Sequence, residues 1–253
     1  LFCYGNAVLQ TSSADYISAG SKPEAVWRAL RARARPSVVL VWHLGLLKLT
    51  PFLRASPAQL VVYLHGIEAW RKQDTFTRRI LSRVNLFLSN SSHTYHRFLE
   101  FVPEARTVPH RVVPLGTGVP DGTRRAPDVP PTALMVSRLD RDEDYKGHRE
   151  VIAAWSGVCS QIPDARLWIA GDGNLRPALE EAAQRGGLQD TVRFVGRVGE
   201  EDKSDLMRAC RCFAMPSRGE GFGLVYLEAM RAGRPCLVGD SDGGREAVNP
   251  PEA

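Results

Sequence analysis

The second half of the chain alternates short apolar runs with stretches of helical periodicity. Apolar runs bounded by Gly or Pro are typical of buried strands, whereas apolar residues three and four positions apart predict helices. Strands that alternate with helices predict a parallel sheet covered on both faces. The expected strands are Thr132–Val136, Ala165–Ala170, Val192–Val195, Cys212–Met215 and Pro235–Val238, and the expected helices are Gly147–Ser156, Arg176–Gln184, Glu200–Ala209 and Leu224–Ala232.

The first half shows the same alternation less regularly. Its expected strands are Ser37–Val41, Gln59–Leu64 and Val84–Leu88, and its expected helices are Glu24–Ala34 and Thr75–Val84. Residues 120–131 are rich in Pro and poor in apolar residues, which is typical of a linker. We therefore predict an α/β protein with two Rossmann-like domains, residues 1–119 and 132–253, whose parallel sheets face each other across a cleft.

Composition fits this picture. The 253 residues are 43% hydrophobic and 24% charged, so a soluble protein with a sizeable core is expected. No apolar run approaches the roughly 20 residues that span a bilayer. The chain opens without Met at Leu1 in what looks like the middle of a fold, so we expect a sequence truncated at both ends. Five cysteines without zinc spacing are typical of reduced thiols in a cytosolic protein.

The two halves differ in charge. Residues 1–130 carry 17 Lys and Arg against 8 Asp and Glu, a net charge of +9, whereas residues 131–253 carry 16 against 20, a net charge of −4. This difference supports two domains. A basic half could face nucleic acid, an anionic membrane or a phosphorylated substrate. Because no nucleic-acid motif with interleaved aromatic residues is present, we expect no nucleic-acid partner.

The segment Arg71–Val84 concentrates part of this positive charge on a predicted amphipathic helix. Its apolar stripe consists of Phe76, Ile80, Leu81 and Val84. Such a stripe either packs on the protein's own sheet and leaves a solvated basic face, or docks on anionic lipid. Both alternatives stay open at the level of sequence.

The segment Ser217–Glu228 carries the candidate chemistry. It follows an expected strand and opens an expected helix, which is where parallel sheets bind ligands. Its glycines allow the backbone to approach a ligand closely, and amides at a helix start are free donors. Transfer of a sugar from a nucleotide sugar needs fixed positive charge beside the diphosphate, from Arg, Lys or a helix N-terminus, and a carboxylate for the ribose hydroxyls. The glycines of this segment are Gly219, Gly221 and Gly223, and they alternate with Glu220 and Phe222.

Glu220 and Glu228, with seven residues between them, resemble the E-x7-E motif of retaining GT-B glycosyltransferases of family 4, the group 1 transferases. Other segments resemble the family's motifs and follow in its order: His65–Gly66, Val113–Gly116, Val136–Leu139, Lys146–His148, Trp168–Gly173, Phe194–Val198 and Gly243–Glu246. Any one of these is weak evidence, but all of them in order are strong. The resemblance covers roughly residues 37–250, with Leu115 standing where the family has Asn.

The resemblance implies a role for each matching residue. Arg138 and Lys146 would hold the donor diphosphate, and Glu220 would lie near the transferred sugar. His65 would reach across the cleft toward the sugar and the acceptor. The other donor-binding positions would be Glu228 on the ribose, Phe222, Gly223 and Leu224 through their amides, and Arg197 and Val198 beside the base. The family retains the anomeric configuration and needs no metal, and without an evident nucleophilic carboxylate we expect a same-face displacement.

Other interpretations of these residues compete with this one. Asp140 and Asp142 imitate the DxD metal motif of GT-A transferases, but that pair arises often by chance, and we expect no metal site. A nucleotide-sugar epimerase or a dinucleotide-dependent oxidoreductase uses similar scaffolding, although the G-x-G-x-x-G fingerprint is incomplete at Gly171–Gly173. A degenerate transferase that only binds nucleotide is the non-enzymatic alternative.

The resemblance as a whole implies a hexosyltransferase that acts in surface polysaccharide or glycoconjugate synthesis. Its donor would be a nucleoside-diphosphate sugar, its acceptor a glycan, a lipid-linked sugar or a small molecule, and no further cofactor is expected. We expect it in the cytoplasm, peripherally bound to the inner face of the membrane. Base, sugar and acceptor stay open.

Overall fold

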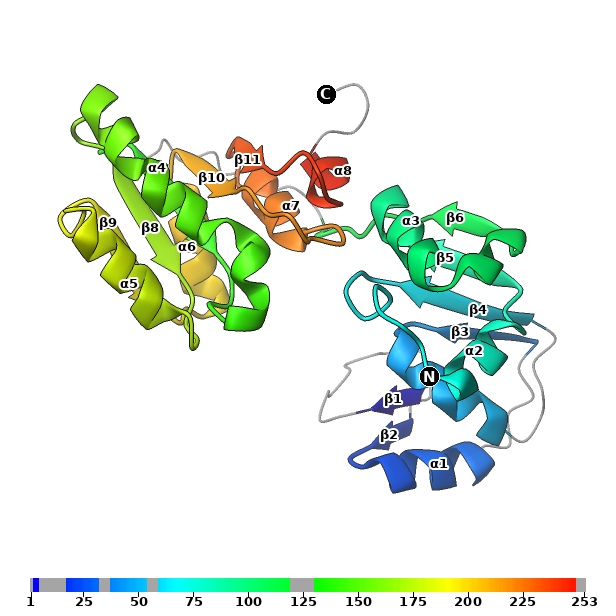
Figure 1. Ribbon diagram of the computed structural model, residues 1–253. Helices are drawn as coiled ribbons and strands as arrows, with labels where there is room; N and C mark the ends of the chain where they lie inside the picture. Colours follow the sequence, from blue (N-terminus) through cyan, green and yellow to red (C-terminus); the bar gives the residue numbers. More distant parts are fainter. Residues whose placement is uncertain (1, 5–16, 32–36, 54–58, 119–129, 249–253) are drawn as a thin grey trace. The chain divides into compact units, whose positions relative to one another are not determined.

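The computed structural model describes residues 2–4, 17–31, 37–53, 59–118 and 130–248 (Figure 1). The chain divides into two compact units, residues 1–90 with 94–113, and residues 91–93 with 114–253. The first unit contains β1 (Phe2–Tyr4), β2 (Ile17–Ala19), α1 (Lys22–Arg31), β3 (Val38–Val41), η1 (Leu44–Phe52), β4 (Gln59–Leu64), α2 (Thr75–Leu81), β5 (Leu86–Ser89), most of α3 (Ser92–Phe101), η2 (Pro103–Thr107) and β6 (His110–Val112).

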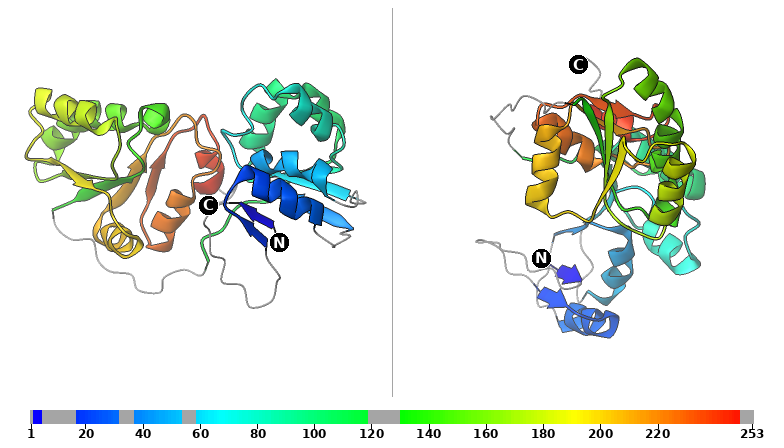
Figure 2. Two further views of the ribbon diagram at one scale, coloured as in Figure 1. Left: turned by 90° about the horizontal axis from the view of Figure 1, so that it is seen from below. Right: turned by 90° about the vertical axis from the view of Figure 1, so that its left-hand side faces the viewer.

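The second unit is built on a five-stranded parallel sheet in the order β11-β10-β7-β8-β9. Helices α4 and α5 cover one face of this sheet, and α6 and α7 cover the other (Figures 1 and 2). Its elements are β7 (Thr132–Val136), η3 (Arg141–Lys146), α4 (His148–Gln161), β8 (Arg166–Ala170), α5 (Arg176–Arg185), β9 (Val192–Gly196), α6 (Glu200–Ala209), β10 (Cys212–Met215), α7 (Leu224–Arg231), β11 (Cys236–Val238) and α8 (Gly244–Val248).

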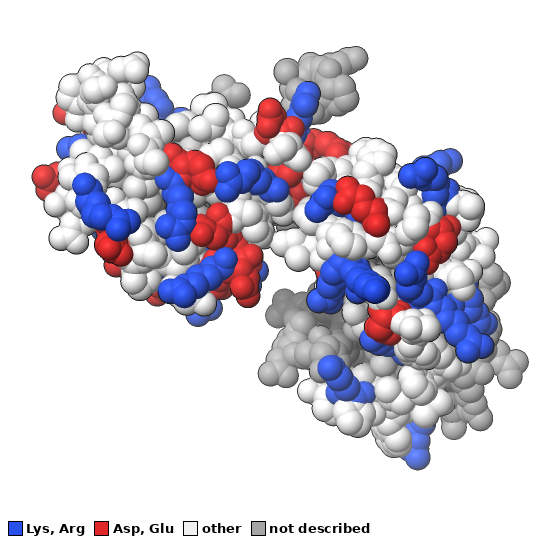
Figure 3. Space-filling model, viewed as in Figure 1, with Lys and Arg blue, Asp and Glu red and all other residues white. Residues whose placement is uncertain are grey.

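The core of the second unit explains why its strands could be predicted. The central strand β7 is almost entirely apolar because helices cover both of its faces, and Leu134 and Met135 are fully buried. Leu167 on β8 and Phe213 on β10 extend the same core. Acidic and basic side chains are interspersed on the surface of this unit, the left-hand part of Figure 3. Alternation of buried strands and amphipathic helices thus gives a doubly covered sheet.

The first unit contains a four-stranded parallel sheet in the order β3-β4-β5-β6 and a separate parallel pair, β1-β2. Leu60, Val62 and Leu64 of β4 point into a core shared with residues of η1, α2 and α3. By contrast, Val38 and Leu40 of β3, and Trp42 directly after that strand, are each about half exposed. The cores of the two units are separate clusters.

The predicted α/β fold with two parallel sheets is confirmed, but several bounds differ. Helix α2 ends at Leu81 rather than Val84. Three residues of the expected stripe, Ile80, Leu81 and Val84, are buried in the unit's own core, whereas the fourth, Phe76, is 47% exposed. Helix α4 continues to Gln161. The predicted linker lies mostly outside the described residues, and the domain bounds 1–119 and 132–253 stay predictions. None of the described helices is long and apolar enough to cross a membrane.

Candidate functional site

The candidate site of the second unit begins at the turn between β10 and α7, where two glycines are closely packed by neighbouring side chains. Gly223 caps α7 with a φ of 82°, and a Cβ there would lie 2.5 Å from the Tyr226 ring. A Cβ on Gly219 would lie 2.8 Å from the ring of Tyr145. Because Gly223 supplies no side-chain cap, the first amides of α7 are offered to a ligand. The close packing of Gly219 and Gly223 therefore fixes the shape of the turn that the sequence predicted.

A second loop, after β11, holds this turn in place. Asp242, only 4% exposed, accepts hydrogen bonds from the backbone N–H of Glu220 at 2.7 Å and of Gly244 at 2.9 Å. The N–H of Gly243 donates to the carbonyl of Glu220 at 2.9 Å. A Cβ on Gly243 would lie 2.0 Å from the carbonyl oxygen of Gly221, so only glycine fits. The backbone of Glu220 is thus fixed from both sides.

Four charged side chains meet beside this turn. The buried carboxylate of Glu143 pairs with Arg138 through one oxygen and with Lys146 through the other, the latter at 3.0 Å. Lys146 also lies 3.5 Å from a carboxylate oxygen of Glu220. The Lys146 and Glu220 side chains are each 15% exposed, whereas Arg138 is 74% exposed. The structure therefore brings together three predicted site residues and adds Glu143.

The positions of Lys146 and Arg138 depend on two neighbouring residues. Gly147 has a φ of 85°, and a Cβ there would lie 2.6 Å from the carbonyl oxygen of Pro216, so this segment packs directly against the end of β10. His148 is fully buried, with Nε2 3.0 Å from the hydroxyl of Ser137. Burial, followed by the charge of Lys146, lowers the pKa of His148 to about 4, so its imidazole is neutral at pH 7.

Tyr145 completes the environment of Glu220. Its ring lies over Gly219, and burial, followed by the carboxylate of Glu220, raises the pKa of Tyr145 to about 12. The phenol therefore stays protonated and can donate a hydrogen bond at physiological pH. Tyr145, Glu143 and Asp242 were missed as site residues in the sequence. A signal was available only for Asp242, which precedes the Gly243–Glu246 motif.

Glu228 lies in a different charged group on the same unit. Its carboxylate pairs with Lys203 at 2.9 Å, and Lys203 pairs equally closely with Glu200. Burial lowers the pKa of Lys203, but the hydrogen bonds to Glu200 and Glu228 outweigh it and raise the pKa overall. These three residues line a cavity of about 450 Å³ together with Thr117 and Leu224. Among the described residues, no ion pair joins this group to Lys146.

The remaining predicted positions are scattered more widely. Arg197 and Val198 line another hollow of the second unit, of about 550 Å³, with Trp168 and Asp202. The side chain of Phe222 is buried in the core, so only its backbone could serve a ligand. No group of three or more His, Cys, Asp or Glu is arranged to hold a metal ion in the part of the chain that the structure describes.

His65 belongs to the first unit, at the end of β4. Its Nε2 lies 2.6 Å from the carbonyl oxygen of Trp42, and its backbone N–H donates to Glu68 at 2.6 Å. Burial is the main cause that lowers the pKa of His65, so the neutral ring donates its Nε2–H to Trp42. The role that the resemblance implies for His65 stays a prediction.

Comparison with known proteins agrees with this geometry. Residues 130–253 match the family described as glycosyl transferases group 1. The chain is 30% identical over 216 residues to a GDP-mannose-dependent monoacylated alpha-(1-6)-phosphatidylinositol monomannoside mannosyltransferase of Corynebacterium glutamicum, an alignment with 78% of this chain and 56% of that protein. It is 35% identical over 112 residues to a mannosylfructose-phosphate synthase of Agrobacterium fabrum, covering 41% of this chain and 25% of that one.

Solved structures share the fold. A crystal structure of TarM superposes with a TM-score of 0.72 at 14% identity, covering 87% of this chain and 45% of that one. Alr3699/HepE of Anabaena, solved with UDP and glucose, superposes with a TM-score of 0.68 at 20% identity, covering 92% and 68%. The fold and the turn after β10 thus define a GT-B glycosyltransferase scaffold. Residues 130–253 belong to the glycosyl transferases group 1, in agreement with the resemblance that the E-x7-E spacing and its neighbouring motifs indicated, and the chain spans about half the length of the mannosyltransferase relative.

Proposed function

We propose that the protein is a retaining, metal-independent hexosyltransferase that moves mannose from GDP-mannose to a lipid-linked or glycan acceptor. The pairing of Lys146 with Glu220, at a glycine turn that opens α7, is the observation that carries this proposal. The mannosyltransferase relatives support the choice of sugar and base, because their names specify GDP-mannose. A role in glycolipid or surface polysaccharide synthesis follows from the same relatives.

In this proposal, the donor diphosphate binds Arg138, Lys146 and the free amides of the first turn of α7. Without ligand, the two cations are balanced by Glu143 and Glu220. The exposed Arg138 can leave Glu143 and turn to the phosphates, so that a phosphate of the donor replaces the carboxylate of Glu143 as its partner. Lys203 occupies one oxygen of Glu228, and the other oxygen is available to a ribose hydroxyl.

The reaction is a displacement on one face of the sugar. The bond between the anomeric carbon and the phosphate oxygen breaks, and its electron pair leaves with the nucleoside diphosphate. The acceptor hydroxyl oxygen bonds to the same face of that carbon, and its proton passes to the departing phosphate oxygen. Lys146, Arg138 and the amides of α7 stabilise the charge that develops on the phosphates, and no metal is needed for that purpose.

Calorimetric titration with GDP, UDP and ADP in EDTA tests the donor site. One nucleotide should bind, and Arg138→Ala and Lys146→Ala should each weaken it by about tenfold or more, because each removes a charge-assisted contact to phosphate. Arg193→Ala, an exposed arginine on β9, is the matched control and should bind normally. A folded chain that binds none of the three nucleotides would falsify the proposed donor site.

Turnover separates an enzyme from a degenerate nucleotide-binding protein. With GDP-mannose and a phosphatidylinositol mannoside acceptor in EDTA, product should form, and proton NMR should show an α-linked mannose. A β-linked product contradicts retention, and activity that requires added divalent cation contradicts metal independence. Nucleotide binding without transfer supports the non-enzymatic alternative.

Contact with an anionic membrane is part of the same proposal. Burial of Ile80, Leu81 and Val84 removes most of the expected apolar stripe, but Phe76 is 47% exposed and lies among exposed cations of residues 71–83. We expect the chain to sediment with vesicles that contain phosphatidylinositol, and to do so less at high salt, where surface charge is screened. Recovery in the supernatant at low salt contradicts membrane contact.

A further inference from the structure

The aromatic ring of Tyr145, near the end of η3, packs against the turn between β10 and α7. The backbone carbonyl of Tyr145 accepts a hydrogen bond from the N–H of Arg218 at 2.9 Å. A Cβ on Gly219 would lie 2.8 Å from Cδ2 and 3.0 Å from Cγ of the Tyr145 ring, so the ring lies directly on that glycine. The backbone and the side chain of one residue thus join η3 to the turn.

This contact explains why a glycine stands at position 219. Gly223 has a φ of 82°, a conformation that favours glycine, but Gly219 is not among the described glycines with a positive φ. What excludes a side chain from Gly219 is the space that the Tyr145 ring fills. The atoms that a Cβ would meet lie near the base of the ring, so they cannot move without the ring as a whole. Residues 145 and 219 are therefore fitted to each other.

The residues that follow Tyr145 and Gly219 are the two that the proposed function places on either side of the bond that breaks. Lys146 would bind the donor diphosphate, and Glu220 would lie near the transferred sugar. The ammonium of Lys146 also lies 6.0 Å from the centre of the Tyr145 ring, at the outer limit of a cation–π contact. Packing of Tyr145 on Gly219 thus sets the separation between the backbones of Lys146 and Glu220.

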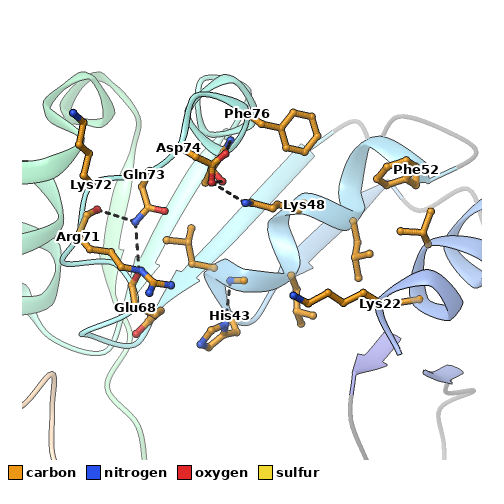
Figure 4. Close-up of a pocket in the computed structure, with 17 residues that line it drawn as sticks. Lys22, His43, Lys48, Phe52, Glu68, Arg71, Lys72, Gln73, Asp74 and Phe76 are labelled. Carbon is orange, nitrogen blue, oxygen red and sulfur yellow. Dashed lines mark hydrogen bonds and ion pairs between the residues drawn. The ribbon is translucent and has the colours of Figure 1, made fainter. Parts of the chain in front are cut away.

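The charged groups agree with such a fixed separation. Lys146 lies 3.5 Å from Glu220 and 3.0 Å from Glu143, although the Lys146 side chain is only 15% exposed. By comparison, the more exposed pair of Lys48 and Asp74 in the first unit closes to 2.7 Å (Figure 4). Opposite charges attract more strongly where less water surrounds them. Lys146 is therefore held between two carboxylates rather than closed on one, as expected where the segments that carry them are held apart.

The ring rather than the hydroxyl makes this contact. The Tyr145 hydroxyl forms no hydrogen bond with any residue that the structure describes, whereas ring atoms of Tyr145 define the space beside Gly219. Gly147 joins the same two segments a second time, because a Cβ there would lie 2.6 Å from the carbonyl oxygen of Pro216. The segments are thus held together at Gly147, and the Tyr145 ring keeps them apart beside Glu220.

We propose that Tyr145 is a positioning residue, whose ring holds Lys146 and Glu220 at the separation that sugar transfer requires. This inference rests on the proposed function, which assigns the diphosphate to Lys146 and the sugar to Glu220. A nucleotide alone contacts only the diphosphate side, whereas transfer needs both sides aligned on the anomeric carbon and its phosphate oxygen. The ring therefore contributes more to the rate of transfer than to nucleotide affinity.

Two substitutions of Tyr145 separate the ring from the hydroxyl. With GDP-mannose and a phosphatidylinositol mannoside acceptor, Tyr145→Ala should lower kcat by about tenfold to a hundredfold, as expected for a small misalignment of reacting groups. Its affinity for GDP, measured by calorimetry, should change by less than about threefold, because GDP does not need Glu220. Tyr145→Phe preserves the ring and its volume, so kcat should stay within about twofold.

Two results of this comparison overturn the proposal. An equal loss of kcat in Tyr145→Phe and Tyr145→Ala would assign the effect to the hydroxyl. A loss of GDP affinity as large as the loss of kcat in Tyr145→Ala would show that the ring serves nucleotide binding rather than alignment.

Leu188→Ala is the matched control for lost packing in the same unit. Leu188 is 6% exposed and belongs to the core of the second unit. Its truncation should lower the melting temperature at least as much as Tyr145→Ala does, but should leave kcat unchanged below the unfolding transition. An equal fall in kcat in both variants would show that stability, not alignment, limits the rate.

A double-mutant cycle tests the fit between ring and glycine. Gly219→Ala should lower kcat because its Cβ displaces the Tyr145 ring. In the Tyr145→Ala background that space is free, so the same substitution should lower kcat by no more than about twofold. Equal factors in both backgrounds would contradict the proposed contact.

The unsubstituted chain keeps this proposal apart from the proposed function. If that chain binds GDP but forms no product, the proposed function fails, and the role of Tyr145 fails with it because there is no transfer to align. If the chain transfers the sugar and Tyr145→Ala does so at the same rate, only the role of Tyr145 is refuted.

Discussion

At the proposed donor site, the carboxylate of Glu143 and the donor diphosphate compete for the same two cations. Glu143 is buried and holds both Arg138 and Lys146, the cations that the resemblance assigns to the diphosphate. A buried carboxylate between two cations stabilises them while no ligand is bound, and then competes with an incoming anion. The acidic run of residues 140–144 indicates that a carboxylate could attract the two cations, but the sequence could not single out Glu143 among the four acidic residues of that run.

Substitution of this carboxylate should therefore strengthen anion binding. Glu143→Gln removes one negative charge beside both cations while nearly preserving shape, so affinity for the bound nucleoside diphosphate should rise about threefold to tenfold. Calorimetry at constant ionic strength measures the change. Glu150→Gln is the matched control, since Glu150 forms an exposed pair with Arg218 at 2.8 Å in the same unit. A tenfold loss of affinity in Glu143→Gln would show that Glu143 positions the cations rather than competes for them.

At the level of elements, hydrophobic periodicity predicted the second unit well because its strands are buried on both faces. Strands β7, β8 and β10 coincide with the expected runs to within a residue. The first unit was harder because its short elements break the period: η1 contains Pro51, and β6 spans only three residues, of which Arg111 and Val112 are exposed. Apolar content alone cannot distinguish such segments from loops.

At the turn after β10, the sequence predicted the local glycine pattern but not the tertiary contacts that hold it. Its glycines were predicted from alternation with Glu220 and Phe222, and two of them are required by Tyr145 and Tyr226. The loop that holds Glu220 from the other side comes from residues 239–244, more than a helix away in sequence. Spacing within one segment predicts which residues are available for chemistry, but the contacts that fix them depend on the packing of β10 against β11.

At the scale of the whole molecule, charge and core are divided in the same way. The basic half of the sequence, net +9, corresponds closely to the first unit, and the half with net −4 corresponds to the second. Each unit has a core of its own. The cluster of Arg138, Glu143, Lys146 and Glu220 in the second unit is balanced in charge, which suits a ligand whose phosphates take over contacts that the carboxylates hold.

Because the cores are separate, GDP bound at the proposed donor site should protect segments of the second unit from hydrogen exchange. A ligand that binds only the native form suppresses the local opening of the segments it contacts. GDP should therefore slow exchange in residues 138–148 and 217–228. Mass spectrometry of peptic peptides measures the change, with Arg138→Ala as the variant in which the protection should be weaker. Unchanged exchange in both segments of a chain saturated with GDP would contradict the proposed donor site.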